Sequence, residues 1–244
     1  MVTPESKLRI GGRDRLILWH VYRYGLTHNE VVYRMYFDPA QHQMEAARKT
    51  LRRLTDGGYL QYLKDPWPYH RLAPAGARVL ESLLGLPPDA LRPATRPFKV
   101  TDALFQRGVL LAFCCLAEIK RELLIPLEVE RWFGPWSRRD VRSWPYYMER
   151  NPEGTVLCYA IVDSGSSRDA QIHRVNKQLQ RRLRQIPALR ELERLGRFRV
   201  TLLTDAPQRA VELNQAFYDA NVTDVQVVAV PETAMIAPSY HTVT

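Results

Sequence analysis

The chain has 244 residues, with 35 Lys and Arg against 26 Asp and Glu, a net charge of +9 and a pI of about 9.6. This length is enough for one or two domains that bury a core without disulfides or metal. No apolar run approaches the ~20 residues of a membrane span, and the N-terminus has no apolar signal core. We therefore expect a cytoplasmic protein with no membrane partner.

The positive charge is concentrated in the N-terminal part of the chain. Residues 1–97 carry 15 basic and 9 acidic side chains, and residues 98–244 carry 20 and 17. A basic surplus favours an anionic partner such as nucleic acid or an acidic membrane surface. The alternative is that the charge only keeps the protein in solution. The uneven distribution directs the search for a binding surface to the first hundred residues.

The cysteines and the common catalytic motifs exclude several function classes. Cys114, Cys115 and Cys158 lie in apolar runs without the spacing of zinc ligands, which predicts buried free thiols and no metal site. The sequence has no Gly-Lys-Ser/Thr phosphate loop, no Gly-x-Gly-x-x-Gly and no Gly-x-Ser-x-Gly. We therefore expect no cofactor.

A proline-rich break separates two predicted domains. Residues 85–97 contain repeated prolines, which lack the N–H needed for regular pairing and bias the preceding residue toward extended backbone. The pattern predicts a first domain over residues 8–84, a linker over 85–97, and a second domain over 98–244.

Helices followed by a hairpin are predicted in the first domain. Gly25 ends the first helix, and Thr27 and Glu30 have the spacing of a capping box at the start of the second. Asp65-Pro-Trp-Pro has the composition of a turn between two strands. The predicted elements are a helix over 13–24, a helix from 27 to Asp38-Pro39, a helix over 40–56, strands over 59–63 and 69–72, and a helix over 74–84.

The third of these helices, residues 40–56, is amphipathic and basic. Its apolar residues Met44, Ala47, Leu51 and Leu54 recur at spacings of three and four, so they face the core. Basic residues occupy the flanks and the opposite side. Three helices followed by a hairpin predict a winged helix-turn-helix whose basic helix enters the major groove of double-stranded DNA. The candidate DNA contacts are Arg48, Lys49, Arg52, Arg53, Lys64, His70 and Arg71.

Two other interpretations of the basic helix stay open. The cations can form an ordinary solvated surface, or the winged helix can belong to a structural subunit that binds protein. Trp67, at the tip of the predicted hairpin, can insert into a groove, contact a partner, or pack back on the hairpin, and we favour the last.

Three segments of the first domain are similar to the replication-relaxation family, winged-helix proteins of bacterial plasmids and mobile elements. They are Arg13-Asp-Arg-Leu-Ile-Leu, Arg48-Lys-Thr-Leu-Arg-Arg-Leu-Thr-Asp-Gly-Gly-Tyr-Leu, and Tyr69-His-Arg-Leu-Ala-Pro-Ala-Gly. The resemblance covers residues 8–84. It implies DNA binding in replication control or transcriptional regulation.

The second domain is predicted to be α/β, so the whole chain is expected to be α+β. Its order of helix, three strands, helix, strand, helix, strand resembles restriction-endonuclease-like domains. The predicted helices cover residues 101–123, 168–195 with an interruption near Pro187, and 207–220, and the predicted strands cover 124–130, 144–149, 155–163, 198–204 and 225–230.

The sequence of the third strand argues against catalysis. In the replication-relaxation family this strand commonly ends in Glu-x-Asp-x-Gly-Thr, and here the stretch is Ile161-Val-Asp163-Ser-Gly165-Ser. An aliphatic side chain cannot bind Mg²⁺. We expect a noncatalytic domain in which Asp163 and Gly165 form a turn and cap the next helix. The alternative is a Mg²⁺-dependent nuclease that uses Asp163 with Asp140 or Glu149.

The helix that begins near residue 168 carries a second basic face. Its members are Arg174, Lys177, Arg181 and Arg184. This face can be a second DNA contact, an assembly surface, or simply a solvated side of the helix. We expect the second domain to mediate homodimerisation or to recruit a replication or transcription protein.

Overall fold

Helices and a β-hairpin form the N-terminal part of the chain, and a five-stranded mixed sheet with helices follows, so the fold is mixed α+β. The chain divides into a first unit, Met1–Leu111 with Met235–Thr244, and a second unit, Ala112–Ala234. The computed structural model describes residues 9–41, 43–96, 101–119, 121–125, 128–129, 131, 145–152, 154–163, 165–222 and 224–237.

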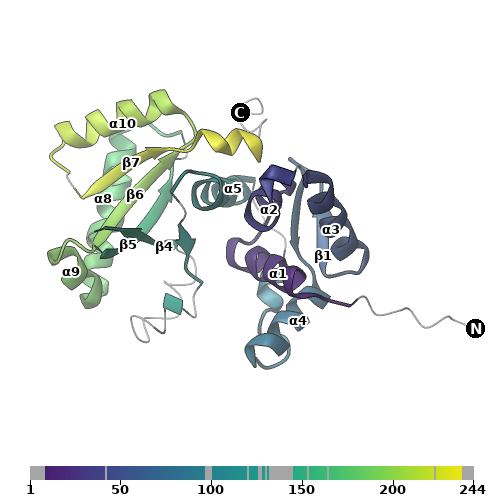
Figure 1. The fold of residues 1–244 in the computed structure, drawn as a ribbon. Helices are drawn as coiled ribbons and strands as arrows, with labels where there is room; N and C mark the ends of the chain where they lie inside the picture. Colours follow the sequence, from purple (N-terminus) through teal and green to yellow (C-terminus); the bar gives the residue numbers. More distant parts are fainter. Residues whose placement is uncertain are drawn as a thin grey trace, which may run out of the picture. The chain divides into compact units, whose positions relative to one another are not determined.

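The first unit follows the predicted order of elements (Figure 1). Helices α1, α3 and α4 each bury one apolar side around the hairpin, and Ile17, Leu51 and Leu80 lie in this shared core. The elements are α1 Gly12–Tyr24, α2 Asn29–Tyr36, the short 3-10 helix η1 Pro39–Gln41, α3 Met44–Asp56, β1 Leu60–Leu63, β2 Tyr69–Leu72, α4 Pro74–Leu84 and η2 Arg92–Thr95.

The start of α2 differs from the predicted capping box. The backbone N–H and C=O of Thr27 both bond to His70 of β2, at 2.8 and 2.9 Å, so Thr27 forms a β-bridge instead of a cap. The cap is His28, whose Nδ1 accepts the N–H of Glu30 at 3.3 Å. The prediction was wrong because capping-box spacing is a local signal, and the partner of Thr27 lies more than forty residues away.

The third helix is shorter than predicted. Residues 40–41 belong to η1, where the Asp38 carboxylate accepts the N–H of Ala40 at 3.0 Å and holds the chain in a turn. Helix α3 begins at Met44. Of the four predicted inward residues, Ala47, Leu51 and Leu54 are fully buried, whereas Met44 in the first turn is only half-buried.

The hairpin turns its aromatic tip residue inward. Strands β1 and β2 pair antiparallel, from Leu60 opposite Leu72 to Leu63 opposite Tyr69. Trp67, in the turn between them, is only 3% exposed. Its ring lies beside Gly108 of α5, Thr101–Cys115, and packing back on the hairpin stays a prediction. A buried indole at this place cannot enter a DNA groove.

The second unit is a mixed sheet with strand order β3-β4-β5-β6-β7 (Figure 1). Strands β3, β4 and β5 pair antiparallel, and β5, β6 and β7 pair parallel. The elements are β3 Glu122–Leu123, β4 Tyr146–Asn151, β5 Gly154–Val162, α8 Arg168–Gln185, α9 Pro187–Arg194, β6 Phe198–Thr204, α10 Pro207–Asp219, β7 Val225–Ala229 and η3 Pro231–Met235.

Two adjacent tyrosines show how the sheet is covered. Successive side chains of a strand point to opposite faces. Tyr146 belongs to the core beneath α8 that includes Val175. Tyr147 contacts Phe113 of α5 edge-on, with ring centroids 5.2 Å apart, and its hydroxyl lies 2.7 Å from the Thr201 hydroxyl. Helices α8, α9 and α10 therefore cover one face, and the end of α5 packs on the other.

The second unit departs from the prediction at its start. The predicted helix over 101–123 ends at Cys115, and Glu122–Leu123 form the short strand β3. Of the predicted strand over 124–130, the described residues are not in a strand: Glu128 and Val129 are helical and both donate their N–H groups to the carbonyl of Ile125, and residues 126, 127 and 130 lie outside the described ranges. The predicted interruption at Pro187 is confirmed, because α8 ends at Gln185 and α9 begins at the proline.

Two predictions on burial and membranes were also tested. Cys114, Cys115 and Cys158 are free and buried, as predicted. In the described ranges, no helix combines the length and the apolar character needed to cross a membrane.

Candidate nucleic-acid interface

The outward side of α3 carries an exposed row of three cations, Arg48, Lys49 and Arg52. The side chain of Arg48 is 60% exposed and that of Arg52 is 84% exposed. Each arginine has a loose partner on its own helix: Glu45 lies 3.9 Å from Arg48, and Asp56 lies 3.7 Å from Arg52. Exposed pairs of this kind contribute ~0.3–0.5 kcal/mol. They leave both guanidinium groups free to exchange a carboxylate for a phosphate.

Arg53, the fourth predicted cation, has a structural role instead. Its guanidinium donates a short hydrogen bond to Asp14 of α1. The Asp14 side chain is 7% exposed and also accepts the N–H of Gly11 at 2.9 Å, just before α1 begins. Arg53 therefore joins α3 to the start of α1. We remove it from the candidate DNA contacts, because a phosphate would have to displace a nearly buried carboxylate.

Two of the three predicted contacts in the hairpin are also buried. His70 is 6% exposed and its Nδ1 lies 3.3 Å from the Thr55 hydroxyl. Burial lowers the pKa of His70 to about 4, so its ring is neutral near pH 7. Arg71 is 9% exposed and donates from Nε to Gln61 at 3.0 Å. Of the predicted hairpin contacts, only Lys64 is exposed.

The sequence analysis did not identify the two carboxylates that partly neutralise the cations of α3. Glu45 lies one turn before Arg48, and Asp56 lies one turn after Arg52, on the same side of α3. Their spacings of three and four residues would have identified them as neighbours of the arginines. The candidate interface on the first unit is therefore Arg48, Lys49 and Arg52, with Lys64 in the hairpin turn.

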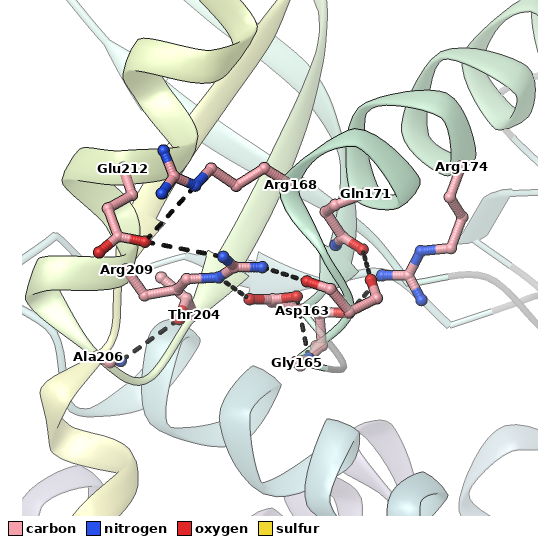
Figure 2. Close-up of polar contacts among 11 residues, drawn as sticks. Asp163, Gly165, Arg168, Gln171, Arg174, Thr204, Ala206, Arg209 and Glu212 are labelled. Carbon is pink, nitrogen blue, oxygen red and sulfur yellow. Dashed lines mark hydrogen bonds and ion pairs between the residues drawn. The ribbon is translucent and has the colours of Figure 1, made fainter.

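Asp163, the remaining carboxylate of the nuclease-like motif, closes a turn at the end of β5. Its side chain is 5% exposed. One oxygen accepts the N–H of Gly165 at 3.1 Å, and the other accepts Nε of Arg209 at 2.9 Å (Figure 2). Arg209 also donates to the carbonyl of Ser166. This arrangement supports the interpretation of Asp163 as a turn residue, since both of its oxygens have partners. The predicted cap is wrong, because the cap of α8 is Ser167, whose hydroxyl accepts the N–H of Ala170 at 3.4 Å.

The surrounding arginines extend the same network (Figure 2). Glu212 of α10 lies 3.9 Å from Arg209 and 4.0 Å from Arg168 at the start of α8. Arg174 of α8 donates to the carbonyl of Val162 at 3.0 Å. Arg174 therefore contacts the end of β5 and does not belong to an open basic face.

Glu149, one of the two other candidate metal ligands, does not join Asp163. Glu149 of β4 is paired with Val156 of β5, seven residues before Asp163. At ~3.3 Å per strand residue the two carboxylates are about 20 Å apart. Glu149 instead accepts a hydrogen bond from Arg121 at 3.0 Å. Asp140 lies outside the described residues, and within those residues no three His, Cys, Asp or Glu side chains form a group that could hold a metal.

Replacing Asp163 by Ala should lower the free energy of unfolding by about 2–3 kcal/mol, because it leaves the partly buried Arg209 without its carboxylate. A double-mutant cycle with Arg209→Met, followed by urea denaturation, should show a coupling of at least ~1 kcal/mol. If the losses of stability in the two single variants simply add up in the double variant, Asp163 and Arg209 do not stabilise each other. Mg²⁺- or Mn²⁺-dependent plasmid cleavage that Asp163→Ala abolishes would instead assign this carboxylate to a metal.

Three members of the predicted second basic face lie together on α8. Lys177, Arg181 and Arg184 are exposed. They line a surface hollow of about 520 Å³ with His173 and several amide side chains. The structure thus brings these three together and separates them from Arg174.

Comparison with known proteins supplies no relative for this chain. A scan against protein-family models, a search of curated proteins and a search of solved structures each found no match. The resemblance to replication-relaxation proteins therefore stays an expectation from the sequence, and the function is inferred from the chain's own residues.

Proposed function

We propose that the chain is a double-stranded DNA-binding protein whose first unit is a winged helix. The observation that carries the proposal is the exposed row Arg48, Lys49 and Arg52 on α3, whose opposite side is buried in the core. The order of three helices and a hairpin supports it. So does the single β-bridge between Thr27 and His70 of β2, which joins the chain before α2 to the hairpin.

The chemistry of the row suits the DNA backbone and the major groove. A helix fits the major groove of B-DNA, where arginine pairs with phosphates or with the edge of guanine. The exposed Lys64 of the hairpin turn is a further phosphate contact in this proposal. Three phosphate contacts from α3 correspond to a slope of about −2.7 for log K against log salt.

The biological context that we propose is replication control or transcriptional regulation on a plasmid or mobile element. Its support is the sequence resemblance of residues 8–84. For the second unit we propose a noncatalytic restriction-endonuclease-like domain that mediates dimerisation or recruits another protein. Its support is the antiparallel meander continued by parallel strands, together with the engagement of Asp163 by Arg209.

Combining Arg48→Ala, Lys49→Ala and Arg52→Ala should weaken DNA binding by about tenfold or more and reduce the salt slope by about 2.7. Thermal stability should change little because the side chains are exposed. Fluorescence anisotropy with a labelled duplex at several salt concentrations measures both quantities. The matched control replaces the exposed Arg78, Arg92 and Arg96, which removes the same charge from the same unit.

Equal losses of DNA affinity in the α3 variant and in its control would overturn the assignment of α3. They would show that affinity depends on the net charge of the unit and not on the position of the cations. An affinity for duplex that does not depend on salt would also overturn the assignment of α3 as a DNA contact. It would favour the alternative that the winged helix contacts protein.

A further inference from the structure

The exposed side of α8 has the composition of a phosphate-binding surface. The hollow of about 520 Å³ is lined by residues that recur every three or four positions, so they share one face of the helix. Each described lining residue carries a nitrogen donor, and none carries a carboxylate. They are His173, Asn176, Lys177, Gln180, Arg181, Arg184 and Gln185.

The opposite side of α8 fixes this face toward solvent. Arg182 is 3% exposed; its Nη1 donates to the Tyr146 hydroxyl at 2.8 Å, and its guanidinium lies 4.6 Å from the ring centre of Tyr159. Val175 and Leu179 belong to the core on the same side. Rotating α8 would expose these apolar residues and remove a buried cation from its tyrosines. The helix is thus held in one orientation.

The cations of α8 are less neutralised than those of α3. In the part of the chain that the structure describes, Lys177, Arg181 and Arg184 form no ion pair with a carboxylate. Arg48 and Arg52 each have one on their own helix. Among the described residues, therefore, no carboxylate pairs with the cations of the α8 hollow, which favours an anionic ligand.

The spacing and the chemistry favour a nucleic acid backbone over an acidic protein. Lys177 and Arg184 are seven residues apart on a helix, which is about 10 Å. One strand of B-DNA presents a phosphate every ~3.4 Å along its axis, so three cations over this length match about three phosphates. Protein interfaces usually have an apolar or aromatic centre. The described residues that line the hollow are all polar or charged, although the carbon atoms of their side chains form much of its surface.

We propose that the exposed face of α8 binds the phosphate backbone of a nucleic acid through Lys177, Arg181 and Arg184. The proposal adds a second contact to the DNA-binding function proposed for α3. It does not require α3 to bind DNA, since its own residues all lie in the second unit.

The test compares three variants of the full chain by anisotropy with a labelled duplex over a range of salt. The first, Lys177→Gln with Arg181→Gln and Arg184→Gln, removes the charge. The second, Lys177→Arg with Arg181→Lys and Arg184→Lys, keeps it. The third is a matched control that replaces Arg150, Arg194 and Arg197 by Gln, which are exposed cations elsewhere in the same unit.

The charge-removing variant should lose about tenfold or more in affinity and reduce the salt slope by about 2.7, whereas the other two should retain the wild-type slope. A charge-removing variant that behaves like the control would overturn the proposal. So would one that binds duplex normally but loses binding to polyglutamate, because the ligand would then be an acidic protein.

The α3 variant separates this proposal from the proposed function. If it binds duplex normally while the α8 variant does not, the assignment of α3 fails and that of α8 stands. If only the α3 variant loses affinity, α8 is not a nucleic acid contact.

Discussion

Acidification from pH 7 to about pH 5 should lower the free energy of unfolding of the first unit by about 4 kcal/mol. The cause is a pair of buried histidines, His20 and His70. Burial, together with the charge of Arg23, lowers the pKa of His20 from 6.5 to about 3. Burial, with a smaller contribution from His28, lowers that of His70 to about 4.

The direction follows from the difference in proton binding between the two states. Below pH 6.5 the unfolded chain protonates both rings, whereas the folded unit keeps His20 and His70 neutral down to about pH 3 and 4. Protons therefore favour unfolding. The stabilisation is complete above pH 6.5 and decreases as the pH falls, by about 1.4 kcal/mol per pH unit for each histidine.

Hydrogen exchange of amides in α1 and β2, measured from pH 7 to about pH 5, reports this change for the first unit. His70→Gln and His20→Leu should each reduce the pH dependence by about half, whatever their effect at pH 7. The control is His173→Gln, since His173 is exposed and lies in the second unit. A stability that does not change over this range would contradict the expected protonation states.

Local patterns predicted most of the elements in this chain. The spacing of Ala47, Leu51 and Leu54 predicted the inward side of α3. The residues of β6, Phe198–Thr204, agree with the prediction at both ends, because a short apolar run between turn residues is a strong strand signal. Each of these signals lies within a few residues along the chain, where periodicity reports directly on burial.

Contacts between distant residues could not be predicted in this way. Arg53 and Asp14 are 39 residues apart, so helical spacing placed Arg53 among the outward cations. His70 was expected to be exposed in a hairpin, but the bridge from Thr27 and the Thr55 hydroxyl cover it. The same limit applies to Asp163, whose partner Arg209 is 46 residues away. Of the predicted binding cations, those that the structure leaves exposed are Arg48, Lys49, Arg52, Lys64, Lys177, Arg181 and Arg184.

Replacing Gly76 by Ala should destabilise the first unit by about 3 kcal/mol, although alanine is the better helix former. Gly76 lies near the start of α4 and is buried. A Cβ added there would overlap the Tyr59 carbonyl oxygen and lie 2.9 Å from Cδ1 of Leu72. The carbonyl cannot move easily because it accepts the N–H of Ala73 at 3.0 Å. The substitution therefore forces α4 away from the hairpin.

The matched control is Gly12→Ala in α1. A Cβ at Gly12 would meet no atom within 4 Å, so this substitution should be neutral or stabilise the unit by up to ~1 kcal/mol. Urea denaturation followed by circular dichroism measures both changes. Opposite signs are expected from the same chemical change in two helices, because only at Gly76 does backbone occupy the space that a methyl group needs. A gain in stability at both positions would show that α4 does not pack this closely on the chain before β1.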